Sequence, residues 1–334
     1  MTNHLYKSNL IFTVFTLWYL TALPPLNAQS PGSEDSLYYS QKTYTYKVVG
    51  DCKISADVYK IHGDTIRPAI LWIHGGALIL GNRGMLDREQ LELYLRAGYV
   101  VVSIDYRLAP ETKLEAIIED LRDAYKWVRE KGPGLFKIDP NRVAVIGHSA
   151  GGYLTLMTGF CVDPPPAALV SFYGYGDIAG EWYNKPDSFY CSQPAVLKEE
   201  AYGAVGGPVI SESPFDKRFR FYIYCRQYGI WPKEVCRHDP NKEPNWFIPY
   251  CPIRNVTKKY PPVILLHGDK DTDVPYEQSV LMAKELERQS IEHELITMPG
   301  YGHVFDLAGK KLKEPAIADA FNRVLEFLKK HVGQ

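Results

Sequence analysis

The most informative stretch of this chain is Val143-Ala144-Val145-Ile146-Gly147-His148-Ser149-Ala150-Gly151. It begins with an apolar run typical of a buried strand, and residues that favour a helix follow it. Glycines two positions before and after Ser149 allow strand and helix to meet in a tight turn, which strains the serine backbone and exposes its hydroxyl. The stretch therefore predicts a strand, a sharp turn and a helix, with Ser149 as a nucleophile. A chance match of common residues is the alternative.

A serine hydroxyl becomes a nucleophile when a base takes its proton and an acid orients that base. In sites of this kind the acid and then the base follow the serine, each on a loop after a later strand. The apolar run of residues 262–266 predicts such a strand, and residues 267–275 follow it. Asp269, Asp271 and Asp273 all lie in this segment, and their spacing alone leaves the choice of the acid open.

His303 is the predicted base. The next predicted strand, residues 294–298, ends in the glycine-rich turn Pro299-Gly300-Tyr301-Gly302-His303, which presents one histidine beyond the edge of the sheet. His267 is a weaker candidate because it ends a strand directly, and we expect it to form local hydrogen bonds. His148 adjoins the nucleophile, but neighbouring side chains diverge at a sharp turn, so we expect it to pack beneath that turn.

A second glycine-rich loop comes earlier in the chain. The apolar run of residues 69–73 predicts a buried strand that ends in His74-Gly75-Gly76-Ala77. Small residues let backbone N–H groups face a substrate, and such groups stabilise negative charge that develops on a carbonyl oxygen. The loop therefore predicts an oxyanion hole, with an ordinary glycine turn as the weaker alternative.

Together these motifs resemble the α/β-hydrolase superfamily and, within it, the serine esterase and lipase branch that includes hormone-sensitive lipase and bacterial acetyl esterases. The segment Asp105-Tyr106-Arg107-Leu108-Ala109-Pro110-Glu111 looks like a signature of that branch, and it implies a structural role near the site. The resemblance runs from about Tyr44 to the C-terminus. It implies an acyl-enzyme intermediate, with water as the second nucleophile.

The resemblance also implies roles for single residues. The acid of the family lies at the position of Asp271 in a His-Gly-x-x-Asp-x-x-Val-Pro pattern, which residues 267–275 reproduce. The oxyanion hole is implied to consist of three backbone amides, those of Gly76, Ala77 and Ala150. Two positions depart from the branch, which usually has Asp in place of His148 and a third glycine in place of Ala77.

Alternating strand and helix signals predict an α/β fold with a mostly parallel central sheet covered by helices on both faces. Apolar residues at helical spacing predict a helix from Leu114 that stops at Gly132-Pro133, and two more over about 277–289 and 315–332. Residues 174–259 are too many for a connecting loop, so we interpret them as a cap insertion over the site. Its many aromatic residues form either its own core or the lining of an acyl or alcohol pocket.

The chain has 334 residues, of which 46% are hydrophobic, and a formal net charge of −1. These values predict a single catalytic domain with a large core and no nucleic-acid partner. The length leaves no room for the propeller that prolyl-oligopeptidase relatives carry. No metal is expected, since no Cys-x-x-Cys or His-Cys spacing occurs, and the predicted chemistry needs no cofactor. The sequence makes no prediction of the oligomeric state.

Residues 1–28 resemble a secretory signal peptide with cleavage near Ala28. Its apolar run, residues 10–23, is shorter than the roughly 20 residues of a membrane span, and an uncleaved anchor is the alternative. We therefore expect a secreted or periplasmic protein of residues 29–334, without stable membrane association after cleavage. Disulfides form in such compartments, and the sequence leaves open whether one or two bridges join Cys191, Cys225, Cys236 and Cys251.

The sequence thus predicts an exported serine carboxylesterase that hydrolyses short-chain carboxylic esters through an acyl-enzyme, with Ser149, Asp271 and His303 as its catalytic residues. Its expected partners are small-molecule or carbohydrate esters, with acetyl or aryl esters of carbohydrate as one candidate class. A serine peptidase or amidase of the same fold is one alternative. A non-catalytic binding protein that keeps the hydrolase fold is the other.

Overall fold

The computed structural model describes residues 37–307 and 311–333. The predicted signal peptide, residues 1–28, lies outside the described residues. Among the described residues, no helix has the length and apolar character needed to cross a membrane.

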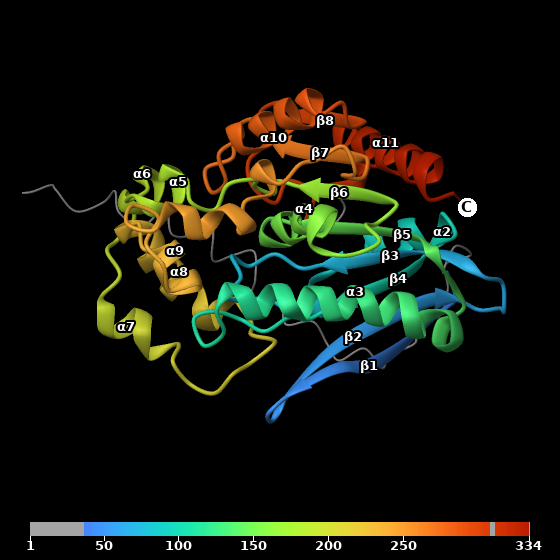
Figure 1. Cartoon of the computed structure of the whole chain (residues 1–334), viewed down its shortest axis with the longest axis horizontal. Helices are drawn as coiled ribbons and strands as arrows, with labels where there is room; N and C mark the ends of the chain where they lie inside the picture. The colour runs from blue at the N-terminus through green and yellow to red at the C-terminus, as the bar shows by residue number, and fades with distance from the viewer. Residues whose placement is uncertain (1–36, 308–310, 334) are drawn as a thin grey trace, which may run out of the picture. The chain divides into compact units, whose positions relative to one another are not determined.

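An eight-stranded sheet forms the centre of the fold, with the strand order β1-β2-β4-β3-β5-β6-β7-β8 (Figure 1). Its strands are β1 (Tyr39–Val49), β2 (Cys52–Ile61), β3 (Arg67–Ile73), β4 (Val100–Ile104), β5 (Ile138–His148), β6 (Ala168–Phe172), β7 (Val263–Gly268) and β8 (His293–Met298). Strand β2 pairs antiparallel with both β1 and β4, and all other pairs are parallel. The predicted mostly parallel sheet is confirmed.

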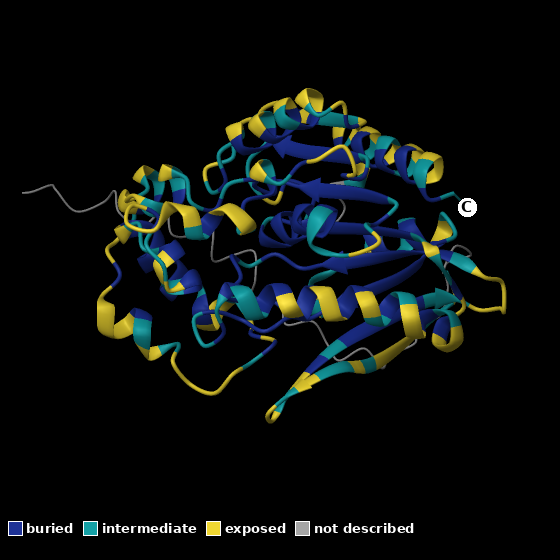
Figure 2. Cartoon of the chain, viewed as in Figure 1, coloured by how far each residue is buried: buried dark blue, intermediate teal, exposed yellow. Residues whose placement is uncertain are grey.

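The central strands are buried on both faces. Every residue of β4, β6 and β7 is buried, which is expected where helices cover a parallel sheet on either side. The covering helices are α2 (Arg88–Arg96), α3 (Leu114–Phe136), α4 (Ala150–Cys161), α10 (Glu277–Arg288) and α11 (Pro315–His331). Figure 2 shows exposed outer sides on α3, α10 and α11 around a buried sheet, whereas α4 is itself largely buried.

Successive strand residues face two different cores. Leu71 and Val145 belong to the same buried cluster as the apolar residues of α3, α4 and α10. Phe172, at the end of β6, packs on the other side of the sheet, with its ring centroid 5.3 Å from that of Phe321 in α11. The sheet therefore has one core on each face, and the helices between the strands cover both.

Helix α3 extends beyond its predicted end. The sequence predicts a stop at Gly132-Pro133, but α3 continues through both residues to Phe136. Proline removes one helical hydrogen bond, whereas the extra turn buries the ring of Phe136, which lies 5.6 Å from that of Trp127. The burial of this ring outweighs the lost bond, and the helix ends at Lys137 in the left-handed conformation.

Several short helices occupy the segment between β6 and β7. They are α5 (Glu181–Asn184), α6 (Ser188–Cys191), α7 (Lys198–Gly203), α8 (Phe215–Tyr228) and α9 (Trp231–Cys236), followed by the 3-10 turns η2 (Pro244–Tyr250) and η3 (Pro252–Arg254). Figure 1 shows α5, α6, α8 and α9 beyond the end of the sheet toward which the parallel strands point. The insertion therefore lies at the edge of the sheet where the loops of the predicted site begin.

Aromatic rings fill the interior of this insertion. The rings of Tyr183 and Trp231 stack with centroids 3.9 Å apart, and Tyr175 meets both edge-on. All three side chains are buried. For these residues the structure favours a core of the insertion over the lining of a pocket. The six cysteines are all free, so none of the disulfides that the sequence left open is present.

Candidate active site

Ser149 lies at the junction of β5 and α4, with a φ of 55°. Two glycines make this junction sterically possible. A Cβ atom on Gly147 would lie 2.2 Å from the carbonyl oxygen of Gly151, and one on Gly151 would lie 2.1 Å from that of Ile73. Only residues without a side chain fit such approaches. The strand, turn and helix that the sequence predicts around Ser149 are all present, and its side chain is half-buried.

The structure brings Ser149, His303 and Asp271 together from three separate loops. The Oγ atom of Ser149 lies 3.1 Å from Nε2 of His303. On the other side of the imidazole, Nδ1 of His303 lies 2.7 Å from Oδ2 of Asp271. Both distances are within hydrogen-bond range, so a proton can pass from the serine to an imidazole that a carboxylate orients.

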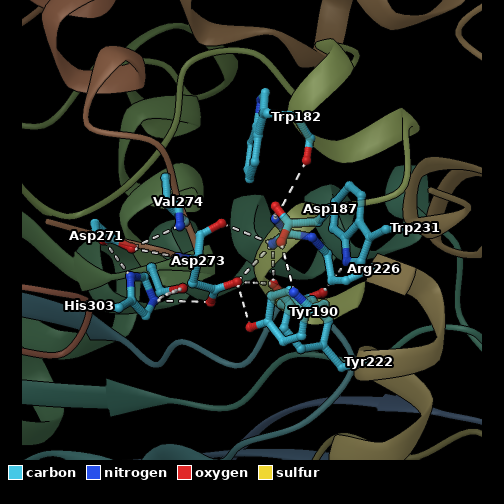
Figure 3. Close-up of polar contacts among 12 residues, drawn as sticks. Trp182, Asp187, Tyr190, Tyr222, Arg226, Trp231, Asp271, Asp273, Val274 and His303 are labelled. Carbon is cyan, nitrogen blue, oxygen red and sulfur yellow. Dashed lines mark hydrogen bonds and ion pairs between the residues drawn. The ribbon is translucent and has the colours of Figure 1, made fainter. Parts of the chain in front are cut away.

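The loop after β7 fixes the carboxylate of Asp271. Its Oδ1 atom accepts hydrogen bonds from the backbone N–H groups of Asp273 and Val274, at 2.8 and 2.9 Å. Of the other candidates for the acid, Asp269 accepts from the backbone of Gly300 in an exposed position. Asp273 lies close to His303 but is bonded mainly to the insertion, as Figure 3 shows.

His267 is fully buried and supports Asp271. Its Nε2 atom lies 3.1 Å from Oδ2 of Asp271 and 3.0 Å from the carbonyl oxygen of Val274. Both neighbours are acceptors, so Nε2 carries hydrogen and Nδ1 accepts from the hydroxyl of Ser279, 2.7 Å away. The local hydrogen bonds expected of His267 are present, and all of its bonding capacity is used away from Ser149.

Charges around the imidazole favour its protonated form. Burial opposes a charge on His303, but the carboxylates of Asp271 and Asp273 outweigh burial and raise the pKa of His303 to about 9. Burial likewise disfavours the Asp271 anion, yet His303 and His267 hold the pKa of Asp271 well below its usual range. The acid therefore stays ionised and stabilises the imidazolium that forms when the serine loses its proton.

The loop after β3 lies against the serine turn. A Cβ atom on Gly75 would lie 2.8 Å from the carbonyl oxygen of His148 and 3.3 Å from Cβ of Ser149. Gly76 has a φ of 106° and Ala77 one of 54°. The amides of Ile79 and Leu80 both donate to the carbonyl oxygen of Gly76 and close the turn.

The three amides predicted for the oxyanion hole are available. Within residues 37–307 and 311–333, the turn bonds leave the N–H groups of Gly76 and Ala77 without an acceptor. Ala150 is the first residue of α4, and the first amides of a helix have no partner inside it. The loop and the helix start thus bring unpaired donors to the vicinity of Ser149.

Sequence reasoning missed a contact from the insertion to this loop. The indole Nε1 of Trp231 in α9 donates to the carbonyl oxygen of Ala77, at 2.9 Å, and its side chain is fully buried. Tyr106, from the Asp105–Glu111 signature, reaches the same loop and donates to the carbonyl oxygen of His74 at 3.1 Å. The Tyr106 bond gives the signature a structural role near the site, as the family resemblance implies.

The partner of His148 is a second feature that no sequence signal marks. The imidazole packs beneath the turn, stacked on Phe172 with centroids 4.4 Å apart, and its Nε2 atom lies 2.8 Å from Oδ2 of Asp306. Asp306 is buried as well, and it accepts from Gln90 and from the hydroxyl of Tyr173. Asp306 follows His303 by three residues, so this network anchors the loop that carries the predicted base.

A metal centre is not a feature of the described residues, which contain no group of three or more His, Cys, Asp or Glu side chains placed to hold an ion.

Comparisons with known proteins agree with this architecture. Among solved structures, a protein of unknown function from Staphylococcus aureus subsp. aureus Mu50 has a TM-score of 0.71 at 22% identity, covering 87% of this chain and 99% of its own. Carboxyl esterase 2 from Tuber melanosporum has a TM-score of 0.65 at 20% identity, and the match covers 91% of this chain and 89% of the esterase. An acetyl ester-xyloside bifunctional hydrolase from Caldicellulosiruptor lactoaceticus has a TM-score of 0.60 at 20% identity, covering 83% and 88%.

The similar curated proteins are much longer than this chain. A non-reducing polyketide synthase from Penicillium rubens is 29% identical over 93% of this chain, and another from Preussia isomera is 29% identical over 81%. The chain spans 14% of the length of either synthase. The profile of the family described as the alpha/beta hydrolase fold matches residues 70–307. The chain therefore belongs to the α/β-hydrolase family.

Proposed function

We propose that this protein is a serine carboxylesterase that hydrolyses short-chain carboxylic esters through an acyl-enzyme. The observation that carries the proposal is the continuous path from Ser149 Oγ to His303 Nε2, at 3.1 Å, and from His303 Nδ1 to Asp271, at 2.7 Å. A nucleophile, a base and an orienting acid in this geometry are the three groups that acyl transfer to a serine requires.

In the first half of the reaction Ser149 Oγ attacks the carbonyl carbon of the ester while its proton passes to Nε2 of His303. The carbonyl oxygen becomes negatively charged, and the amides of Gly76, Ala77 and Ala150 donate hydrogen bonds to it. When the intermediate collapses, the bond to the alcohol breaks and Nε2 returns its proton to the leaving oxygen. The acyl group remains on Ser149.

In the second half water takes the place of the alcohol. His303 accepts one proton of this water as its oxygen attacks the acyl carbon, and the same three amides stabilise the second oxyanion. Collapse of this intermediate breaks the bond to Oγ, which recovers its proton from Nε2. Throughout, Asp271 fixes the orientation of the imidazole and offsets its positive charge.

Export of the protein and action on acetyl or aryl esters of carbohydrate are further parts of the proposal. The signal-peptide pattern of residues 1–28 supports export. The similar protein from Caldicellulosiruptor lactoaceticus is described as an acetyl ester-xyloside bifunctional hydrolase, which supports carbohydrate esters as a class to test here. Amino-terminal sequencing of the protein recovered from culture medium or periplasm tests the predicted cleavage near Ala28.

A serine amidase or peptidase is the second candidate, with Ser149, His303 and Asp271 in the same roles. An amine leaves only when it receives a proton, and Nε2 of His303, 3.1 Å from Oγ of Ser149, is placed to pass the serine's proton to it. Turnover of aminoacyl p-nitroanilides without turnover of esters would establish this candidate.

The remaining alternative is a non-catalytic binding protein. It predicts no reaction with a fluorophosphonate, which labels activated serines.

The deciding experiment compares the wild type with Ser149→Ala on p-nitrophenyl acetate. Removing the hydroxyl is expected to lower kcat by about 10⁴-fold or more, because only binding and oxyanion stabilisation remain. Ser188→Ala, which removes an exposed hydroxyl from the insertion, is the matched control and is expected to keep full activity. Unchanged turnover in the Ser149→Ala protein would contradict the proposal.

A further inference from the structure

Asp273 places a second carboxylate beside the predicted catalytic base. It lies two residues after Asp271, but it approaches the opposite nitrogen of the imidazole, with Oδ2 3.4 Å from Nε2 of His303. This nitrogen also contacts Oγ of Ser149. Figure 3 shows the Asp273 carboxylate between His303 and the side chains of the insertion. The acyl-transfer mechanism described above needs one carboxylate, so Asp273 is left without a role in it.

The insertion holds the other oxygen of this carboxylate. Oδ1 of Asp273 accepts from Nη1 of Arg226 at 2.7 Å and from the hydroxyl of Tyr190 at 2.9 Å, and the hydroxyl of Tyr222 donates to it as well. A carboxylate oxygen has two lone pairs, so three donors leave Oδ1 no capacity for a ligand. The three bonds also keep Oδ2 directed toward His303.

Arg226 is itself rigidly held. Its side chain is fully buried, and its Nη2 atom lies 2.8 Å from Oδ2 of Asp187. Its guanidinium carbon lies 4.9 Å from the ring centre of Tyr190 and 5.1 Å from that of Tyr183. Such stacking on aromatic faces is a preferred environment for guanidinium. Asp273 is therefore fixed by a preorganised cluster rather than by a mobile surface pair.

Oδ2 of Asp273 keeps the capacity to accept from a ligand. Within the described part of the chain, His303 is the one group that offers it a donor. Asp273, His303 and Ser149 are each partly exposed, so a substrate can reach them. During acylation the oxygen of the leaving alcohol must lie within hydrogen-bond reach of Nε2. In that position Oδ2 of Asp273 lies beside the carbon atoms of the alcohol that are nearest to its ester oxygen.

The chemistry at this place favours a neutral donor over a cationic one. His303 becomes positively charged in the transition state, and its Nε2 lies 3.4 Å from Oδ2, so an ammonium group bound to Oδ2 would repel the imidazolium. A hydroxyl donates to a carboxylate without adding a charge, in a bond stronger than one between neutral groups. We propose that Asp273 selects esters whose alcohol carries a free hydroxyl on the carbon adjacent to the one that bears the ester oxygen, as in partly acylated sugars and other polyols.

This inference rests on the proposed esterase activity and is tested with a matched pair of esters. The substrates are 2-hydroxyethyl acetate and 2-methoxyethyl acetate, which have the same acyl group and differ in the donor on the neighbouring carbon. We expect kcat/KM of the wild type to favour the hydroxyl ester by about tenfold or more, the usual effect of one hydrogen bond to a charged group. Because the ratio is taken within one enzyme, effects common to both esters cancel.

The variant Asp273→Asn removes the acceptor and keeps the shape. The three donors at Oδ1 hold the amide oxygen in that place, so the NH₂ group replaces Oδ2 beside His303. We expect the ratio to fall to about one in this variant. Asp187→Asn is the matched control, because Asp187 also pairs with Arg226 without contacting His303, and its ratio is expected to equal that of the wild type.

A second measurement needs only the wild type. In acetyl transfer from p-nitrophenyl acetate to an added alcohol, the bond from the acyl carbon to Oγ breaks, a bond to the alcohol oxygen forms, and the alcohol proton passes through Nε2 to Oγ. We expect ethylene glycol to capture the acyl group in preference to 2-methoxyethanol.

Three outcomes would overturn the role of Asp273: equal capture of the two alcohols, equal hydrolysis of the two esters, or an unchanged ratio in Asp273→Asn. Full turnover of both esters by Ser149→Ala would instead refute the esterase proposal itself.

Discussion

The indole of Trp231 donates a hydrogen bond of 2.9 Å to the carbonyl oxygen of Ala77. Trp231 belongs to the insertion, whereas Ala77 belongs to the loop whose amides are proposed to bind the oxyanion. Ala77 has a φ of 54°, a conformation that costs energy for any residue with a side chain. The bond from Trp231 helps to offset this cost and fixes the direction of the peptide unit that follows Ala77.

Trp231→Phe is expected to weaken catalysis more than binding. Phenylalanine retains the stacking on Tyr183 but removes the donor to Ala77. We expect kcat on p-nitrophenyl acetate to fall by about tenfold with little change in KM, since an oxyanion donor acts mainly in the transition state. Trp182→Phe is the matched control, because it removes an indole bond to the carbonyl oxygen of Asp177 instead. Equal effects of the two substitutions would show that Trp231 is merely structural.

The pH profile of the enzyme is expected to be alkaline. His303 acts as a base only after it loses its proton, so activity should rise with pH through its pKa of about 9. In Asp273→Asn one of the two carboxylates that raise this pKa is removed, and the rise of kcat/KM should move to lower pH. Initial rates on a substrate without ionisable groups, measured from about pH 6 upward, across the ordinary range of histidine, check both expectations. A shift toward higher pH would contradict the assigned charges.

Gly151→Ala is expected to prevent the serine turn from forming. The added methyl group would lie 2.1 Å from the carbonyl oxygen of Ile73 and 2.6 Å from that of His74, and backbone atoms cannot give way as a flexible side chain can. We expect a loss of about 3 kcal/mol or more in the free energy of unfolding, measured with urea. Gly134→Ala in α3 is the control, because a methyl group there meets no atom within 4 Å. It should be neutral or stabilise the helix by up to about 1 kcal/mol.

Asp306→Asn should destabilise the fold in a pH-dependent way. Burial opposes the Asp306 anion, but His148, Tyr173 and Gln90 outweigh it and lower the pKa of this carboxyl. A depressed pKa gives stability that is complete above the unfolded value of about 3.9 and is lost as the pH falls from there through the lower folded pKa. At neutral pH we expect a loss of about 2–4 kcal/mol in the free energy of unfolding.

The check for Asp306→Asn is to repeat the urea titration in acid. As the pH falls toward about 3, below the unfolded pKa, the difference between the wild type and the variant should shrink, because the Asp306 carboxyl is then increasingly protonated in the unfolded wild-type chain. A difference that stays constant from neutral pH to this acid limit would show that the ionised form of Asp306 adds nothing to stability.

The sequence predicted the sheet and the placement of the site because the relevant signals are local. Fully apolar runs such as residues 143–146 are the expected pattern of strands buried on both faces. The serine turn needs glycines at fixed spacing. The loop after β7 offers aspartates as the acid, and the loop after β8 offers one histidine as the base. For Ser149 and His303 the element order alone determines that their loops share one edge of the sheet.

What the sequence could not predict depends on packing between distant segments. The bond of His148 to Asp306 joins residues 158 positions apart, and neither has a neighbouring motif that marks it. The same holds for Arg226, whose contact with Asp273 forms only when the insertion folds over the site. The predicted end of α3 was wrong for a related reason, since a local rule about proline competed with the tertiary burial of Phe136.

The pairing of Arg226 with Asp273 also limits how this enzyme can be re-engineered or diversify. A foreign insertion grafted between β6 and β7 would lack the buried guanidinium, and the Asp273 carboxylate would then stand uncompensated next to the imidazole. Such a chimera needs a replacement cation or a simultaneous change at position 273. The proposed selectivity and the reactivity of the imidazole therefore depend on the same pair, and a change to either residue is expected to alter both.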